Sequence, residues 1–208
     1  KDKPSLIVLG GPARCGKSTL AQRMEINDRF FGFSEDALLT HIFTTRIKSN
    51  QSGAANHLLV YLERSRYKNR RIGLSTRPID RMAKERVAKL IQIANKTNTV
   101  SLGDLVFSTF QKAANEKNKA IAFFADVHAE FWGTEILEKY QHSVLLVVLR
   151  EPVSAIAAAL YWQAYPSRIK HSKRHFWYRL LLWCASVGVA QNLSKKYPNR
   201  VFFEWVWR

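Results

Sequence analysis

The stretch Ser5-Leu-Ile-Val-Leu-Gly-Gly-Pro-Ala-Arg-Cys-Gly-Lys-Ser-Thr-Leu20 decides the fold. Its first five residues form a short, continuously apolar run, which is typical of a buried parallel strand. The residues from Ser18 onward favour a helix, because Leu20 and Met24 lie four positions apart on one helical face. Between the strand and the helix stands the pattern G-x-x-x-x-G-K-S, at residues 11–18. This order predicts a loop that binds phosphate groups.

We call residues 11–18 the phosphate loop. Glycine lets the backbone fold around a phosphate, so that successive N–H groups point inward, and the following helix N-terminus adds partial positive charge. We expect Lys17 to reach terminal phosphoryl or sulfuryl oxygens, and Ser18 to hold Mg²⁺ where a metal is used. The predicted binding residues of this stretch are Gly11, Pro12, Ala13, Arg14, Cys15, Gly16, Lys17, Ser18 and Thr19.

Further apolar runs alternate with helical patterns along the chain. This alternation predicts an α/β fold: a three-layer, P-loop NTPase-like parallel sheet of about five strands, with helices on both faces. Residues 1–208 are expected to form a single domain, with a helical insertion at about 37–118. Besides residues 5–9, we expect strands at 30–33, 121–125, 144–149 and 201–203. We expect one helix at the residues from Trp132 to Tyr140, a second that begins at about 153, and a third at about 176–195 that follows a basic loop.

Polar residues follow several of these strands. Because ligands lie beyond the carboxyl ends of the strands in such sheets, we expect these residues to converge on one edge. The residues concerned are Gly11, Glu35 and Asp36, Asp126, Arg150 and Glu204.

Two of these strand ends suggest specific roles. Glu35 or Asp36 is the first candidate for a general base that deprotonates an acceptor hydroxyl, with His128 as the weaker candidate. Arg150 suits bidentate recognition of a phosphate. A salt bridge between Arg150 and Glu151 or a neighbouring acid is the alternative reading.

The bulk composition favours a globular protein with anionic partners. Hydrophobic residues make up 47% of the chain and charged residues 24%, and the net charge is +17. Such a field attracts phosphate- or sulfate-bearing molecules. Two cysteines, Cys15 and Cys184, give no disulfide framework and no metal-ligand spacing, so a cytoplasmic setting is expected. The apolar runs are too short to span a bilayer, and no membrane span is predicted.

From about residue 5 to 206 the chain resembles the P-loop sulfotransferases that use 3′-phosphoadenosine-5′-phosphosulfate (PAPS). The phosphate loop is similar to that family's 5′-phosphosulfate loop, and Leu149-Arg-Glu-Pro152 is similar to its 3′-phosphate site. Other resembling stretches are Gly32-Phe-Ser-Glu35, Ser101-Leu-Gly-Asp-Leu leading to Ala125-Asp126, and Phe202-Phe-Glu-Trp205.

The resemblance implies an enzyme that transfers a sulfuryl group from PAPS to a hydroxyl acceptor, which could itself be acidic. It implies that Arg150 holds the 3′-phosphate, with Ser154 standing in for the family's serine. Loop amides, Lys17 and Arg14 would stabilise charge on the equatorial oxygens during transfer.

Two other interpretations remain open. The Gly-Lys-Ser loop is also typical of ATP-dependent kinases for small molecules or polynucleotides, in which Asp126 and Ser18 would hold Mg²⁺. A third interpretation is a non-enzymatic nucleic-acid binder, in which basic clusters with interleaved aromatic residues, at 64–71 and 168–179, track a backbone and stack bases.

Overall fold

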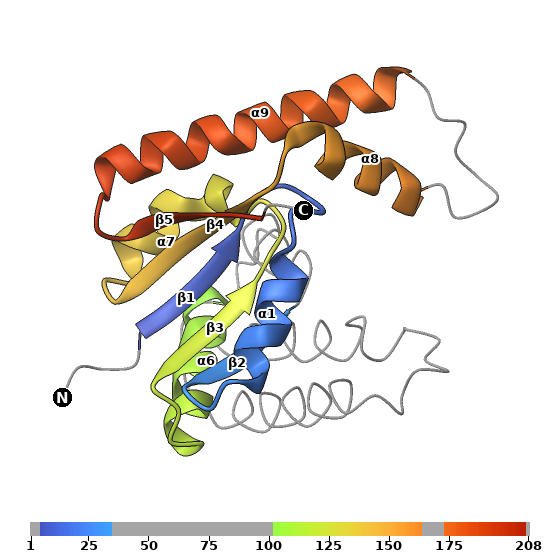
Figure 1. Cartoon of the computed structure of the whole chain (residues 1–208). Helices are drawn as coiled ribbons and strands as arrows, with labels where there is room; N and C mark the ends of the chain where they lie inside the picture. Colours follow the sequence, from blue (N-terminus) through green and yellow to red (C-terminus); the bar gives the residue numbers. More distant parts are fainter. Residues whose placement is uncertain (1–4, 35–101, 164–172, 207–208) are drawn as a thin grey trace. The chain divides into compact units, whose positions relative to one another are not determined.

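The computed structural model describes residues 5–34, 102–163 and 173–206. Strands and helices alternate through these residues, as the sequence pattern predicts (Figure 1). The elements are β1 Ser5–Gly10, α1 Lys17–Ile26, β2 Phe30–Ser34, α6 Leu102–Glu116, β3 Ile121–Ala125, the short 3-10 helix η1 Ala129–Trp132, α7 Gly133–Lys139, β4 Ser143–Leu149, α8 Pro152–Gln163, α9 Lys173–Lys196 and β5 Val201–Trp205.

The strands form one five-stranded sheet in the order β2-β3-β1-β4-β5. Strands β4 and β5 pair in parallel, with Leu145 opposite Val201 and Leu149 opposite Trp205. The predicted α/β class with a parallel sheet of about five strands is therefore confirmed. The placement of Glu204 after the last strand is wrong, because β5 continues to Trp205 and Glu204 pairs with Val148 inside it.

Two helix boundaries differ from the prediction. Helix α9 begins at Lys173, within the stretch expected to be a basic loop, since lysine and arginine are good helix formers. The helix predicted from Trp132 is preceded by η1, and α7 proper begins at Gly133. Helix α6 lies in the last part of the expected helical insertion, which as a whole stays a prediction. Residues 35–101, with Glu35, Asp36, Ser101 and the 64–71 cluster, lie outside the described residues.

The residues group into two compact units. The first comprises Lys1–Ile7 and Ala21–Phe124. Within it, Phe107 and Phe110 of α6 pack on Phe124 of β3, with ring centroids 5.5 and 5.3 Å apart. These edge and tilted contacts are the arrangements that aromatic pairs prefer.

The second unit comprises Val8–Leu20 and Ala125–Arg208, and it contains the phosphate loop. Its long helix α9, orange to red in Figure 1, contacts α8, η1, α7 and β5. The prediction of a single domain remains a prediction.

Two glycines give a matched test of the described packing. A Cβ at Gly32 of β2 would lie 1.9 Å from the Phe123 backbone oxygen, whereas a Cβ at Gly188 of α9 meets nothing within 4 Å. We expect Gly32→Ala to destabilise the protein by about 2–4 kcal/mol, because the backbone of β2 or β3 must move to admit the methyl group. Gly188→Ala should stabilise it by about 1 kcal/mol through helix propensity. Urea unfolding of both variants checks this, and equal effects would contradict the packing around β2.

Candidate functional site

Three residues of the phosphate loop have the positive φ that lets a backbone turn sharply. Gly11 and Gly16 adopt φ of 111° and 100°, and Arg14 adopts φ of 66°. A Cβ at Gly11 would lie 2.2 Å from the Val148 carbonyl oxygen, so only glycine fits beside β4. Leu20 N–H then donates to Gly16 O at 3.0 Å, which starts helix α1 directly after the loop. The predicted strand, loop and helix are all present.

Lys17 is the innermost polar side chain of this loop. It is only 6% exposed, and its ammonium donates to the carbonyl oxygens of Gly11 at 2.7 Å and Pro12 at 2.6 Å. The charge therefore lies against the first turn of the loop. Arg14, Ser18 and Thr19, by contrast, are exposed at the loop and the first turn of α1.

The side chain of Cys15 faces the protein core. It is fully buried and packs with Val148 and Ala155, and partly buried Trp183 lies against the same cluster. Burial raises the pKa of the Cys15 thiol, which keeps it protonated. Any contribution of Cys15 to anion binding would therefore come from its backbone.

A buried carboxylate, Glu130 of η1, lies beside the loop. It is 1% exposed, and its Oε2 accepts a hydrogen bond from Gly11 N–H at 2.6 Å. Its Oε1 accepts from the Ser186 hydroxyl of α9 and lies 3.2 Å from His128 Nδ1. His128 has left-handed backbone geometry, and its own N–H donates to Gly11 O at 3.1 Å. Two hydrogen bonds, one to the Glu130 side chain and one from the His128 backbone, thus join the segment 128–130 to Gly11.

The charge state of Glu130 determines the direction of these hydrogen bonds. Burial alone would raise its pKa, but hydrogen bonds with His128 and Ser186 together hold the pKa below the ordinary value. Glu130 is therefore ionised and can only accept hydrogen bonds. Because a carboxylate cannot donate, a hydrogen bond between the two groups requires a proton on His128 Nδ1.

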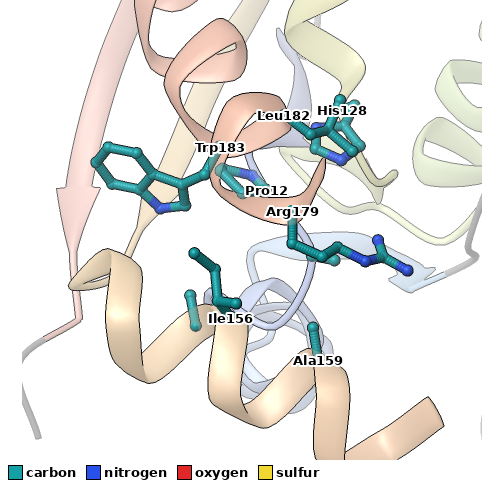
Figure 2. Close-up of a pocket in the computed structure, with 9 residues that line it drawn as sticks. Pro12, His128, Ile156, Ala159, Arg179, Leu182 and Trp183 are labelled. Carbon is teal, nitrogen blue, oxygen red and sulfur yellow. The ribbon is translucent and has the colours of Figure 1, made fainter. Parts of the chain in front are cut away.

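His128 also lines a small pocket between the phosphate loop, α8 and α9 (Figure 2). The pocket has a volume of about 10 Å³, room for about one water-sized group. Two buried nitrogens of its lining, His128 Nε2 and Trp183 Nε1, have no hydrogen-bond partner among the described residues. The lining residues are Pro12, Ala13, His128, Ala155, Ile156, Ala159, Arg179, Leu182 and Trp183.

Arg150 follows β4, and the neighbouring Glu151 serves a local purpose. The Glu151 carboxylate accepts hydrogen bonds from the backbone N–H groups of Ser154 at 2.7 Å and Val153 at 2.8 Å, capping α8. These bonds lower the pKa of Glu151. No ion pair joins Arg150 to Glu151 in the part of the chain that the structure describes, but the charge of Arg150 also helps to lower the pKa of Glu151, and both readings of Arg150 stay predictions. The N–H of Ser154 is already committed to this cap.

Asp126 lies directly after β3, as the sequence predicts. It is 1% exposed, and its N–H donates to Leu9 O of β1 at 2.9 Å. Across residues 5–34, 102–163 and 173–206, no three His, Cys, Asp or Glu side chains are grouped as metal ligands. The assignment of Asp126 and Ser18 to Mg²⁺ stays a prediction, as does the role of Glu35 or Asp36, which lie outside the described residues.

Glu130 and Ser186 are the site residues that the sequence reasoning missed. Glu130 follows His128 by two positions in a stretch that was expected only to lead into a helix, and Ser186 stands among apolar residues of α9. A lone polar residue within an apolar helical stretch is the signal that could have indicated a buried partner.

The 168–179 basic cluster is described only from Lys173 onward, where it forms the first turns of α9. Trp177 and Tyr178 are 58% and 59% exposed, and the Arg179 guanidinium lies 5.9 Å from the Tyr178 ring centroid. Exposed rings next to a cation are compatible with nucleic-acid stacking, which remains a prediction. Within the described residues, no helix combines the length and apolarity needed to cross a membrane.

No family model matches the chain, and no curated protein sequence does. Among solved structures, a sulfotransferase domain from the curacin biosynthetic pathway is 14% identical, with a TM-score of 0.48, over 99% of this chain and 68% of that one. TT1252 from Thermus thermophilus is 11% identical, with a TM-score of 0.42, over 100% and 91% of the two chains. At these values neither likeness identifies a function.

Proposed function

We propose that this protein is a sulfotransferase-like enzyme that transfers a sulfuryl group from PAPS to a hydroxyl acceptor. The observation that carries group transfer to a hydroxyl, which this proposal shares with the kinase alternative below, is the position of His128. Its backbone is hydrogen-bonded to Gly11 of the phosphate loop, and its Nε2 is buried and has no hydrogen-bond partner among the described residues. A base at the edge of an anion cradle is what attack by a hydroxyl group requires.

The phosphate loop fits the donor's 5′-phosphosulfate. Positive φ at Gly11 and Gly16 leaves the loop open to close approach, and Lys17 brings a buried positive charge to its first turn. When bound, PAPS would supply the sulfuryl group and a good leaving phosphate. Lys17 and the loop N–H groups would stabilise the charge that develops on the leaving oxygens. Arg150, directly after β4, would hold the 3′-phosphate.

The acceptor hydroxyl would lie beside His128. The lining pocket has room for about one water-sized group, which is also the size of a hydroxyl. His128 Nε2 would take the proton of this hydroxyl as its oxygen attacks, while Nδ1–H remains donated to Glu130. The apolar neighbours Ile156 and Leu182 would exclude bulk water from the reacting group.

An ATP-dependent kinase is the second candidate, and one observation favours it. Asp126 is buried at the end of β3, and its backbone N–H donates to the carbonyl oxygen of Leu9, two residues before the phosphate loop. An acid in this place would suit Mg²⁺ held jointly with Ser18. The acceptor chemistry at His128 would be the same, because both reactions begin with deprotonation of a hydroxyl.

Thermal unfolding separates the two donors. A ligand that binds only the folded state raises the unfolding midpoint, so adenosine 3′,5′-bisphosphate should raise it and Mg-ATP should raise it less. In Arg150→Ala we expect the affinity for the bisphosphate to fall by about 1.5–3 kcal/mol, the usual worth of a charged hydrogen bond. The affinity for Mg-ATP, which has no 3′-phosphate, should be unchanged.

Arg23→Ala serves as the matched control, since it removes the same charge from the exposed last turn of helix α1 rather than from the end of β4. Tight binding of Mg-ATP by the wild-type protein, with no response to the bisphosphate, would overturn the sulfotransferase proposal in favour of the kinase.

A further inference from the structure

Glu130 is a buried acid that connects three separate parts of the second unit. Its two carboxylate oxygens meet the Gly11 N–H of the phosphate loop, the Ser186 hydroxyl of α9 and Nδ1 of His128. These partners are 119, 56 and 2 residues away in the sequence. Long-range contacts of this kind depend on the complete fold.

The surrounding residues provide both the space for the Glu130 side chain and hydrogen-bond donors for its carboxylate. A Cβ at Gly10 would lie 2.9 Å from Glu130 Oε2, so glycine at the end of β1 leaves room for the carboxylate. Burying a carboxylate is costly unless it is hydrogen-bonded, and here each oxygen has a donor. A neutral acceptor could brace the loop and α9 at lower cost, which indicates that the charge itself has a use.

We propose that Glu130 is a positioning residue whose carboxylate holds His128 in the Nδ1–H tautomer and fixes it against the first turn of the phosphate loop. The expected effect of Glu130 on transfer rests on the proposed function. The tautomer of His128 does not, because it is a property of the folded protein whether or not PAPS is bound. Because the carboxylate cannot donate a hydrogen bond, the neutral ring keeps its proton on Nδ1 and presents Nε2 as the base.

The charge-removing variant Glu130→Gln tests this directly. The glutamine amide can still accept from Gly11 through its oxygen, but its NH₂ group would then donate toward His128 Nδ1. We expect the neutral ring to change to the Nε2–H tautomer, which is useless as a base at that nitrogen. The tautomer is measured by long-range ¹H–¹⁵N NMR, with the His128 signals identified by their loss in His128→Gln.

Ser186→Ala is the matched control, since it removes a donor to the same oxygen without changing the charge. We expect Ser186→Ala to retain the Nδ1–H tautomer. In Glu130→Gln the rate of transfer from PAPS should fall, at most by the factor that a general base contributes, which is about 10²–10⁴. The affinity for the bisphosphate should change little.

A Glu130→Gln protein that folds and keeps the Nδ1–H tautomer would reduce Glu130 to a structural brace and overturn the inference. Should this variant not fold, the wild-type spectrum decides: an Nε2–H ring there would also overturn it. Wild-type protein that does not bind the bisphosphate would instead refute the proposed function, while the tautomer measurement would stand.

Discussion

Lys17→Ala should lose transfer activity by about 10²–10³-fold or more. This is the effect of removing one preorganised group that stabilises charge in the transition state. Lys17 is the buried cation of the phosphate loop, and its ammonium lies 2.7 Å from Gly11 O and 2.6 Å from Pro12 O. Steady-state transfer of labelled sulfate from PAPS to a panel of phenols and alcohols measures the loss.

The controls must distinguish a specific loss of catalysis from the effect of removing any positive charge and from unfolding of the variant. Lys195→Ala removes one positive charge from the exposed last turn of α9 and should leave transfer unchanged. Removing Lys17 also takes a donor from two loop carbonyls, which should cost about 1–3 kcal/mol of stability. Circular dichroism and thermal unfolding check that the variant remains folded. A folded Lys17→Ala protein with full turnover would remove the loop from the mechanism.

The phosphate loop shows which features of the site a sequence can predict. Its strand, glycines and helix are contiguous, so local rules determine its shape: Gly11 and Gly16 do take the positive φ that the motif requires. The inward direction of Cys15 and the contacts of Lys17 were not predictable, because both depend on partners in β4, α8 and the loop's own carbonyls.

The Glu130 network shows what sequence reasoning cannot reach. Glu130 and Ser186 lie 56 residues apart, and only the packing of α9 on η1 brings their side chains together. Strand ends, by contrast, follow from sheet topology, so Asp126 and Arg150 were placed correctly. Glu204 was misplaced because the pairing of β5 with β4 continues for two residues beyond the apolar run 201–203.

The pocket beside the loop gives His128 an advantage over the other candidate bases. His128 has a fixed ring, since Nδ1 meets Glu130 and the ring stacks on Phe131 with centroids 5.4 Å apart. Glu35 and Asp36 follow β2 in the sequence, and their role stays a prediction from strand order alone. Direct comparison of the three side chains therefore decides which one serves as the base.

His128→Gln should lower the rate of transfer by about 10²–10⁴-fold, the usual contribution of a general base. Affinity for adenosine 3′,5′-bisphosphate should change little, because the base acts on the acceptor's proton and not on the nucleotide. Calorimetric titration gives the affinity, and single-turnover transfer gives the rate. His142→Gln is the matched control, since His142 is an exposed histidine between α7 and β4.

Glu35→Gln and Asp36→Asn complete the comparison. If His128 is the base, neither variant should approach the loss seen in His128→Gln, although either could raise the KM of an acceptor. A large loss in Glu35→Gln or Asp36→Asn, together with normal turnover in His128→Gln, would move the base to the end of β2. In that outcome the lack of a hydrogen-bond partner for the buried His128 Nε2 among the described residues would need another explanation, whereas the phosphate loop and Lys17 would keep their roles.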